Sequence, residues 1–142
     1  SLCGGDLRRY RLAALFQLTF PGMPSIFYGD ELGVMGVCED EYRREMPWAD
    51  GDAALHEFFR RAIALRRGLA PLRRGDFRCV SAERGSGLFA FSREYGGERV
   101  YVAVNCSDRA EKCALPGEKL WSEGLEADRI GPYGFAVTVS RG

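Results

Sequence analysis

Two adjacent carboxylates, Asp30 and Glu31, are the groups of this sequence that come nearest to an acid–base pair. They follow a predicted strand, at the end where α/β barrels build their active sites. Paired carboxylates can cleave a glycosidic bond with retention when their carboxyl groups lie about 5 to 5.5 Å apart. Neighbouring strand residues point to opposite faces, so we expect these two side chains to diverge if the strand extends that far. Two roles stay open: the carboxylates order their loop, or they support a binding cleft indirectly.

The sequence offers few other groups for catalysis or metal binding. His56 is the only histidine and lies beside the apolar stripe of a predicted helix, where we expect a structural role. The five cysteines are widely scattered and form no CxxC pair, so we predict neither a metal site nor a cofactor. We interpret them as reduced thiols and expect a cytoplasmic location, although a leader on a longer parent chain would lie before Ser1.

Charge and hydropathy argue against two classes of partner. The chain has 20 Lys and Arg residues against 20 Asp and Glu residues, and no stripe of basic residues that would suit nucleic acid phosphates. The apolar run between Leu12 and Phe20 is interrupted by Gln17 and Thr19, and a membrane-spanning helix needs about 20 apolar residues. We therefore expect neither nucleic acid nor a membrane as a partner.

The first half of the chain combines helical and strand-like patterns. Apolar residues recur at helical spacing between Asp6, a good N-cap, and Pro21. Residues 24–28 form a short apolar run bounded by Pro and Gly, which is typical of a strand buried in a parallel sheet. A second helical stripe at residues 55–68 ends before Pro71. The predicted element order of this half is therefore a helix, a strand and a second helix.

From about Arg73 onward, the apolar period changes from 3.6 to 2. The candidate strands are residues 77–80, 88–93, 99–105, 110–115, 119–122 and 135–139. Gly96 and Gly97 predict a tight hairpin, because glycine accepts the positive φ angles that such turns need. Several short strands at this spacing predict an antiparallel β-sandwich. We therefore predict two domains, residues 1–72 and 73–142.

Four motifs in this order resemble the α-amylase superfamily. Residues 15–33, LFQLTFPGMPSIFYGDELG, resemble the seventh helix and eighth strand of its barrel, often written PGxPxIYYGDE. Residues 43–48, RREMPW, resemble the RRPMPWD stretch of neopullulanase, cyclomaltodextrinase and oligo-1,6-glucosidase relatives. Residues 72–77 resemble the start of the C-terminal β-sandwich, and residues 132–137 its last strand. The implied fold is an α+β fragment: two helices and one strand from the end of a TIM barrel, followed by an antiparallel β-sandwich.

This resemblance implies a parent enzyme that is a retaining glycoside hydrolase acting on α-glucosidic bonds. Its aspartate nucleophile, glutamate acid/base and stabilising aspartate all lie upstream of the position that matches Leu7. A complete barrel also needs about 250 residues, more than the 142 present here. We therefore predict no catalytic residue in this chain and no activity of the chain alone. The parent's expected partners are an α-glucan or maltooligosaccharide and the rest of the catalytic barrel.

The charged loop at residues 38–44 matches the family's "NDPDCRR" stretch, whose first aspartate and first arginine bind glucose units. At the matching positions of this sequence, the substrate-binding residues implied by the resemblance are Glu39 and Arg43. A carboxylate and a guanidinium suit the vicinal hydroxyls of a sugar, because charged partners make the stronger hydrogen bonds. The sequence departs from the family at Glu39, which is one methylene longer, and at Asp40 and Glu45, which replace prolines. The alternative is a solvated charged loop in which Arg43 pairs with a nearby acid.

Aromatic side chains offer another way to hold sugar rings, by stacking. The candidates in the first predicted domain are Tyr28, Tyr42 and Trp48. Those in the second are Tyr101, Trp121, Tyr133 and Phe135. For all of them we favour core packing or loop anchoring.

Three functions follow from these patterns. The leading hypothesis is a non-catalytic, structural part of an α-glucan-degrading hydrolase. The alternatives are an α-glucan-binding β-sandwich module and a fragment that self-associates as a homo-oligomer through its unpaired barrel elements. Substrate choice depends on loops outside this chain, so the sequence does not distinguish among the α-glucans.

Overall fold

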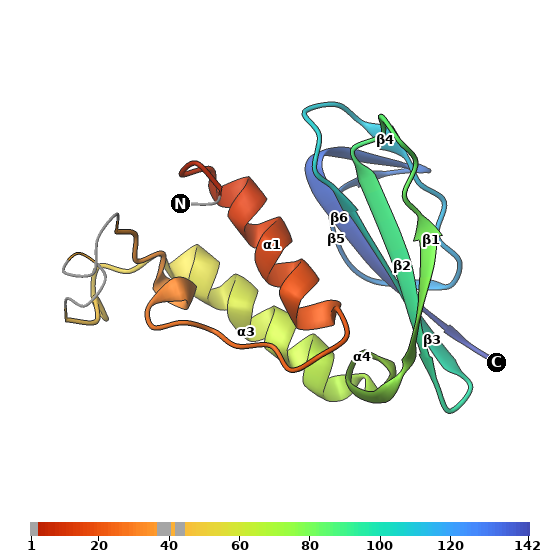
Figure 1. Cartoon of the computed structure of the whole chain (residues 1–142), viewed down its shortest axis with the longest axis horizontal. Coiled ribbons are helices and arrows are strands. Elements are labelled where there is room, and N and C mark those ends of the chain that lie inside the picture. Colours follow the sequence, from red (N-terminus) through yellow and green to blue (C-terminus); the bar gives the residue numbers. More distant parts are fainter. Residues whose placement is uncertain (1–2, 37–40, 42–44) are drawn as a thin grey trace.

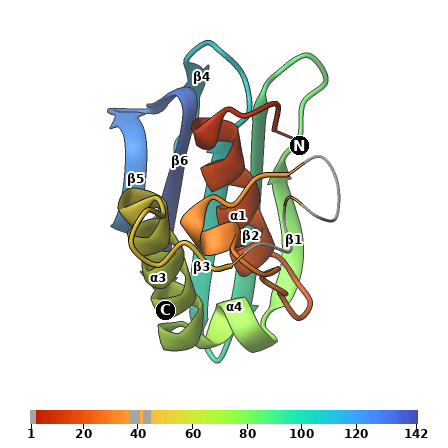
Figure 2. The same cartoon turned by 90° about the vertical axis from the view of Figure 1, so that its left-hand side faces the viewer.

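The computed structural model describes residues 3–36, 41 and 45–142. The helices of this part are α1 (Leu7–Thr19), η1 (Asp30–Leu32), α3 (Ala53–Gly68) and α4 (Ala70–Arg74). The strands are β1 (Asp76–Ser81), β2 (Leu88–Tyr95), β3 (Glu98–Asn105), β4 (Glu111–Lys112), β5 (Glu118–Glu126) and β6 (Arg129–Arg141). Helices α1, α3 and α4 lie together on one face of the sheet (Figures 1 and 2). None of the described helices is long and apolar enough to span a membrane.

Both predicted long helices are confirmed, and each begins at an aspartate cap. The Asp6 carboxylate accepts a hydrogen bond from the Arg8 backbone N–H over 2.9 Å, which satisfies one of the free donors of the first turn. Asp52 does the same for the N–H of Leu55 at the start of α3, over 2.8 Å. Helix α1 ends at Thr19, two residues before Pro21, because proline cannot supply the N–H that would continue the helix.

The strands form a single antiparallel sheet in the order β1-β2-β3-β6, with β4 and β5 also paired to β6. The predicted hairpin is confirmed between β2 and β3, where Gly96 and Gly97 have φ angles of 60° and 80°. These left-handed angles suit the right-handed twist of the flanking strands. The hairpin sets the register that places Phe91 opposite Val102, and both side chains are fully buried under the helices.

The predicted two-sheet sandwich is wrong for the described residues, because all six strands belong to one sheet. The helices take the place of a second sheet on the inner face. There Phe58 of α3 packs on Trp121 of β5 with ring centroids 4.7 Å apart, and Trp121 packs on Phe135 of β6 at 4.9 Å. The opposite face carries a smaller cluster, in which buried Cys113 packs with Ala103. One core therefore joins helices and sheet, and the two-domain division stays a prediction.

The predicted strand at residues 24–28 is also wrong, because this segment has no strand structure. A buried parallel strand needs neighbours on both sides, and no described strand pairs with this segment. Its large side chains are instead exposed, with 61% of Phe27 and 45% of Tyr28 accessible, next to Met23 at 95%. The segment runs along the helical layer from the end of α1 to η1 (Figure 1).

Arg66 near the end of α3 holds the C-terminal end of α1. Its guanidinium donates to the backbone carbonyls of Leu18, Phe20 and Gly22. The last turn of α1 carries no basic residue of its own, so Arg66 supplies the positive charge that a helix C-terminus favours. This contact fixes the path of the chain as it leaves α1 toward the candidate site.

Candidate functional site

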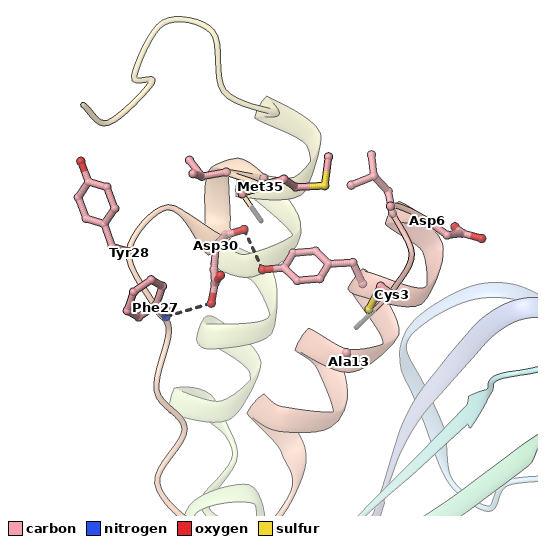
Figure 3. A pocket seen from close by; sticks show the side chains of 13 residues that line it. Cys3, Asp6, Ala13, Phe27, Tyr28, Asp30 and Met35 are labelled. Atoms are coloured by element: carbon pink, nitrogen blue, oxygen red, sulfur yellow. Dashed lines mark hydrogen bonds between the residues drawn. The ribbon is translucent and has the colours of Figure 1, made fainter. Parts of the chain in front are cut away.

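A hollow near the predicted carboxylates lies between the start of α1 and the loop that follows Tyr28. It has a volume of about 420 Å³. Its lining residues are Cys3, Gly5, Asp6, Leu7, Tyr10, Ala13, Phe27, Tyr28, Asp30, Gly33, Val34, Met35 and Gly36. Figure 3 shows that the side chains come from two walls, α1 on one side and residues 27–36 on the other. The lining is mostly apolar, so this pocket suits an apolar surface better than a charged ligand.

Asp30 anchors the loop wall of this pocket. Its carboxylate accepts a hydrogen bond from the Phe27 backbone N–H over 3.0 Å, and its backbone carbonyl accepts one from the Tyr10 hydroxyl over 3.2 Å (Figure 3). Burial, together with the nearby Asp30 carboxylate, raises the pKa of Tyr10 above its ordinary value. Tyr10 therefore stays protonated and acts as a donor that ties the loop to α1.

Glycine makes the tight turn around Asp30 possible. Gly29 has a φ of 79°, and a Cβ added there would lie 2.5 Å from Cγ2 of Val34. Only a residue without a side chain fits this position, since both the backbone angle and the space exclude one. Gly33 closes the 3₁₀ turn with a φ of 73°. The Gly-Asp-Glu-Leu-Gly run of the sequence is thus a compact turn that presents Asp30 and Glu31.

Asp30 and Glu31 diverge, as the sequence predicts, although they lie in a 3₁₀ turn and not at a strand end. Asp30 lines the pocket beside Tyr10, whereas Glu31 lines a second hollow with His56 and Arg60 on α3. Because they face different hollows, these carboxylates do not flank a common substrate atom. The hydrogen bonds of Asp30 support its loop-ordering role.

His56, for which the sequence predicts a structural role, is exposed. It lies on the exposed face of α3 and borders the second hollow, together with Ile26, Met46 and Phe59. Among the described residues, no group of three or more His, Cys, Asp or Glu side chains is arranged to hold a metal ion.

The predicted substrate-binding residues Glu39 and Arg43 lie outside the described residues, as does Tyr42. Their role stays a prediction. Trp48 follows this loop and is 78% exposed, so core packing does not account for it. In the sheet, Trp121 and Phe135 are 5% and 1% exposed, which confirms the prediction that they pack in the core.

No sequence pattern predicted the pocket beside Asp30. Tyr10 carries the clearest signal for it, a polar-tipped aromatic within the apolar stripe of a helix. Its partner Asp30 is 20 residues away, and a helical period does not predict which distant loop a side chain meets. Cys3 and Met35 also line the pocket. They come from two segments that only the fold brings together, and no sequence pattern links these segments.

No protein-family model matches this chain. Individual sequences do. Neopullulanase 2 of Thermoactinomyces vulgaris is 37% identical over 136 residues, which cover 90% of this chain and 23% of that protein. A cyclomaltodextrinase of Geobacillus thermopakistaniensis is also 37% identical, over 96% of this chain and 26% of its own length. The chain thus spans about a quarter of the length of these relatives.

Solved structures give the same result. The debranching enzyme of Nostoc punctiforme superposes with a TM-score of 0.83 and 27% identity, over 94% of this chain and 31% of that one. A cyclomaltodextrinase superposes with a TM-score of 0.75 and 32% identity, over 97% of this chain and 25% of that one. The similarity therefore includes both the helices and the sheet.

Proposed function

Because this chain belongs to the α-amylase superfamily and matches the C-terminal region of its α-glucan-degrading hydrolases, we propose that it is the non-catalytic end of such an enzyme. In this proposal residues 1–72 complete the parent's (β/α)₈ barrel, and residues 73–142 form the C-terminal domain that supports it. The parent's substrate is an α-glucan or maltooligosaccharide, and its location is the cytoplasm.

The observation that carries the proposal is the contrast between the two sides of the helical layer. Toward the sheet, Phe58 is only 5% exposed and packs on Trp121 and Phe135. Away from it, the segment before η1 leaves Phe27, Tyr28 and Met23 largely exposed. An exposed apolar segment of this size marks a surface that another part of the structure covers. In this proposal, the other strands and helices of the parent's barrel cover this exposed segment.

Glu39 and Arg43 are the proposed sugar-binding residues of the parent. Support comes from their place in the chain, between the pocket-lining Gly36 and exposed Trp48. They follow the segment that resembles the eighth strand of the barrel, and in a barrel the loops after the strands carry the active site. The sugar-binding role of the sheet has less support, because Trp121 and Phe135 are buried and Arg8 and Arg9 stack on Tyr133.

A chimera tests the proposal. Neopullulanase 2 truncated before its matching C-terminal region should be insoluble or inactive, and fusion to this chain should restore folding and hydrolysis of α-glucans. A matched fusion carrying Gly29→Val, which the turn cannot accept, should restore much less. If the chimera folds cooperatively but stays inactive, while the intact relative is active, the chain does not complete a catalytic barrel. Restoration by an unrelated β-rich domain would equally contradict the assigned role.

A further inference from the structure

Strand β1 leaves one long edge of the sheet open. It pairs with β2, and no other described strand pairs with its second side. The opposite edge, β5, is interrupted by two register shifts, between Lys119 and Trp121 and between Glu123 and Leu125. Irregular or lysine-bearing edge strands resist pairing with another chain, whereas regular edge strands can pair with one readily. Strand β1 has no lysine or proline, and its single irregularity lies at its far end, after Cys79.

The first three side chains of β1 are all exposed. Phe77 faces the helices and packs edge-on against Phe20 at 5.1 Å, yet 42% of it remains exposed. Asp76 and Arg78 lie on the other face and are exposed, and neither forms a hydrogen bond or ion pair with another described residue. Asp76 stands opposite Glu94 of β2, whose own carboxylate is engaged by the Arg99 guanidinium.

We propose that this edge pairs with the same edge of a second copy of the chain, antiparallel and centred on Phe77. In that register Asp76 lies opposite the partner's Arg78, and Arg78 lies opposite the partner's Asp76. A two-fold axis therefore produces two ion pairs from one Asp-x-Arg sequence.

The same register brings the two Phe77 rings together on the helical side. An aromatic pair directly opposite in an antiparallel sheet adds to its stability. The paired edges join two six-stranded sheets into one continuous sheet with both helical layers on the same side. This interface is distinct from the helical surface that the proposed function assigns to the rest of the barrel, so the two can be tested separately.

Charge reversal tests the register. Sedimentation equilibrium of the 142-residue chain should give a concentration-dependent mass that approaches two chains. Asp76→Arg and Arg78→Asp each place like charges opposite each other, and each should raise the dimer Kd by about tenfold or more. The double variant Asp76→Arg with Arg78→Asp restores opposite charges and should recover most of the affinity. Arg84→Glu in the exposed loop after β1 is the control and should leave Kd unchanged.

Three results would overturn the proposal. The first is a wild-type chain that remains monomeric at all accessible concentrations. The second is a dimer that neither single reversal weakens, which would place the interface elsewhere. The third is a double variant as weak as the single ones, with circular dichroism and thermal unfolding equal to wild type.

Discussion

Arg93 of β2 donates a hydrogen bond from its Nη1 to the backbone carbonyl of Thr19, the last residue of α1, over 3.1 Å. The same guanidinium donates to the carbonyls of Leu72 and Gly75 at either end of the α4 C-terminal turn. Arg93 is 3% exposed, and burial, with the nearby charge of Arg66, lowers its pKa. No described carboxylate lies within ion-pair distance of Arg93, so the helix-end carbonyls it bonds, together with the nearby charge of Asp76, offset its buried charge.

Replacing Arg93 by methionine should therefore destabilise the whole fold. The methionine side chain occupies much of the same space as the arginine stem, but the carbonyls of Thr19, Leu72 and Gly75 lose their donor and stay buried. We expect a loss of about 2 to 4 kcal/mol in the free energy of unfolding, measured by urea denaturation. Arg84→Met, on an exposed loop, is the matched control and should change the stability little. Equal midpoints for the two variants would show that the Arg93 hydrogen bonds contribute nothing.

The cap of α1 should make stability depend on acid pH. Hydrogen bonding to Arg8 lowers the pKa of Asp6 from 3.8 to about 2. A carboxyl whose pKa is lower in the folded state stabilises that state above its unfolded pKa, and this contribution is lost as the pH falls from about 4 to about 2. Thermal unfolding across this range should show a steeper fall in Tm for wild type than for Asp6→Asn, which keeps a neutral cap. Parallel profiles would contradict the charge contribution.

The purified chain should release no reducing sugar from starch, pullulan, cyclodextrin or maltotriose. Retaining hydrolysis needs two carboxyl groups that flank the same glycosidic bond. Asp30 and Glu31 line different hollows and so do not meet this requirement. The measurement is a reducing-sugar assay with a full-length relative as positive control. Activity above a blank that follows the protein through successive columns would contradict this expectation.

The role of Arg43 must be measured in the longer enzyme or in the chimera. If Arg43 holds a glucose unit away from the cleavage point, Arg43→Ala removes charge-assisted hydrogen bonds worth about 1.5 to 3 kcal/mol. Such contacts persist into the transition state, so KM should rise more than kcat falls. Maltohexaose should lose more kcat/KM than maltose. An equal proportional loss on both substrates would instead indicate a residue that braces its loop.

The sequence predicted the local parts of this structure best. Helices α1 and α3 and the Gly96-Gly97 hairpin follow from caps, apolar periods and backbone angles that neighbouring residues determine. The packing of strands into one sheet under helices did not follow, because period 2 shows that a face is buried but not what covers it. Residues 24–28 illustrate the same limit: the apolar run suits a buried strand, yet a strand also needs neighbours.

Much of the candidate site depends on contacts between distant segments. The divergence of Asp30 and Glu31 could be predicted, since adjacent side chains cannot share a face. The tie between Tyr10 and Asp30 could not, because it joins a helix to a turn 20 residues later. The burial of Trp121 and Phe135 was predicted correctly from alternation alone.

The hold of Arg66 on α1 has a consequence for the order of events during synthesis. Helix α1 leaves the ribosome before α3, because Arg66 follows Leu18 by 48 residues. Until that guanidinium arrives, the end of the helix has only water as a partner, and its apolar stripe faces solvent. A nascent chain in this state is a natural client for chaperones that bind exposed apolar helices, and it remains one until α3 has been made.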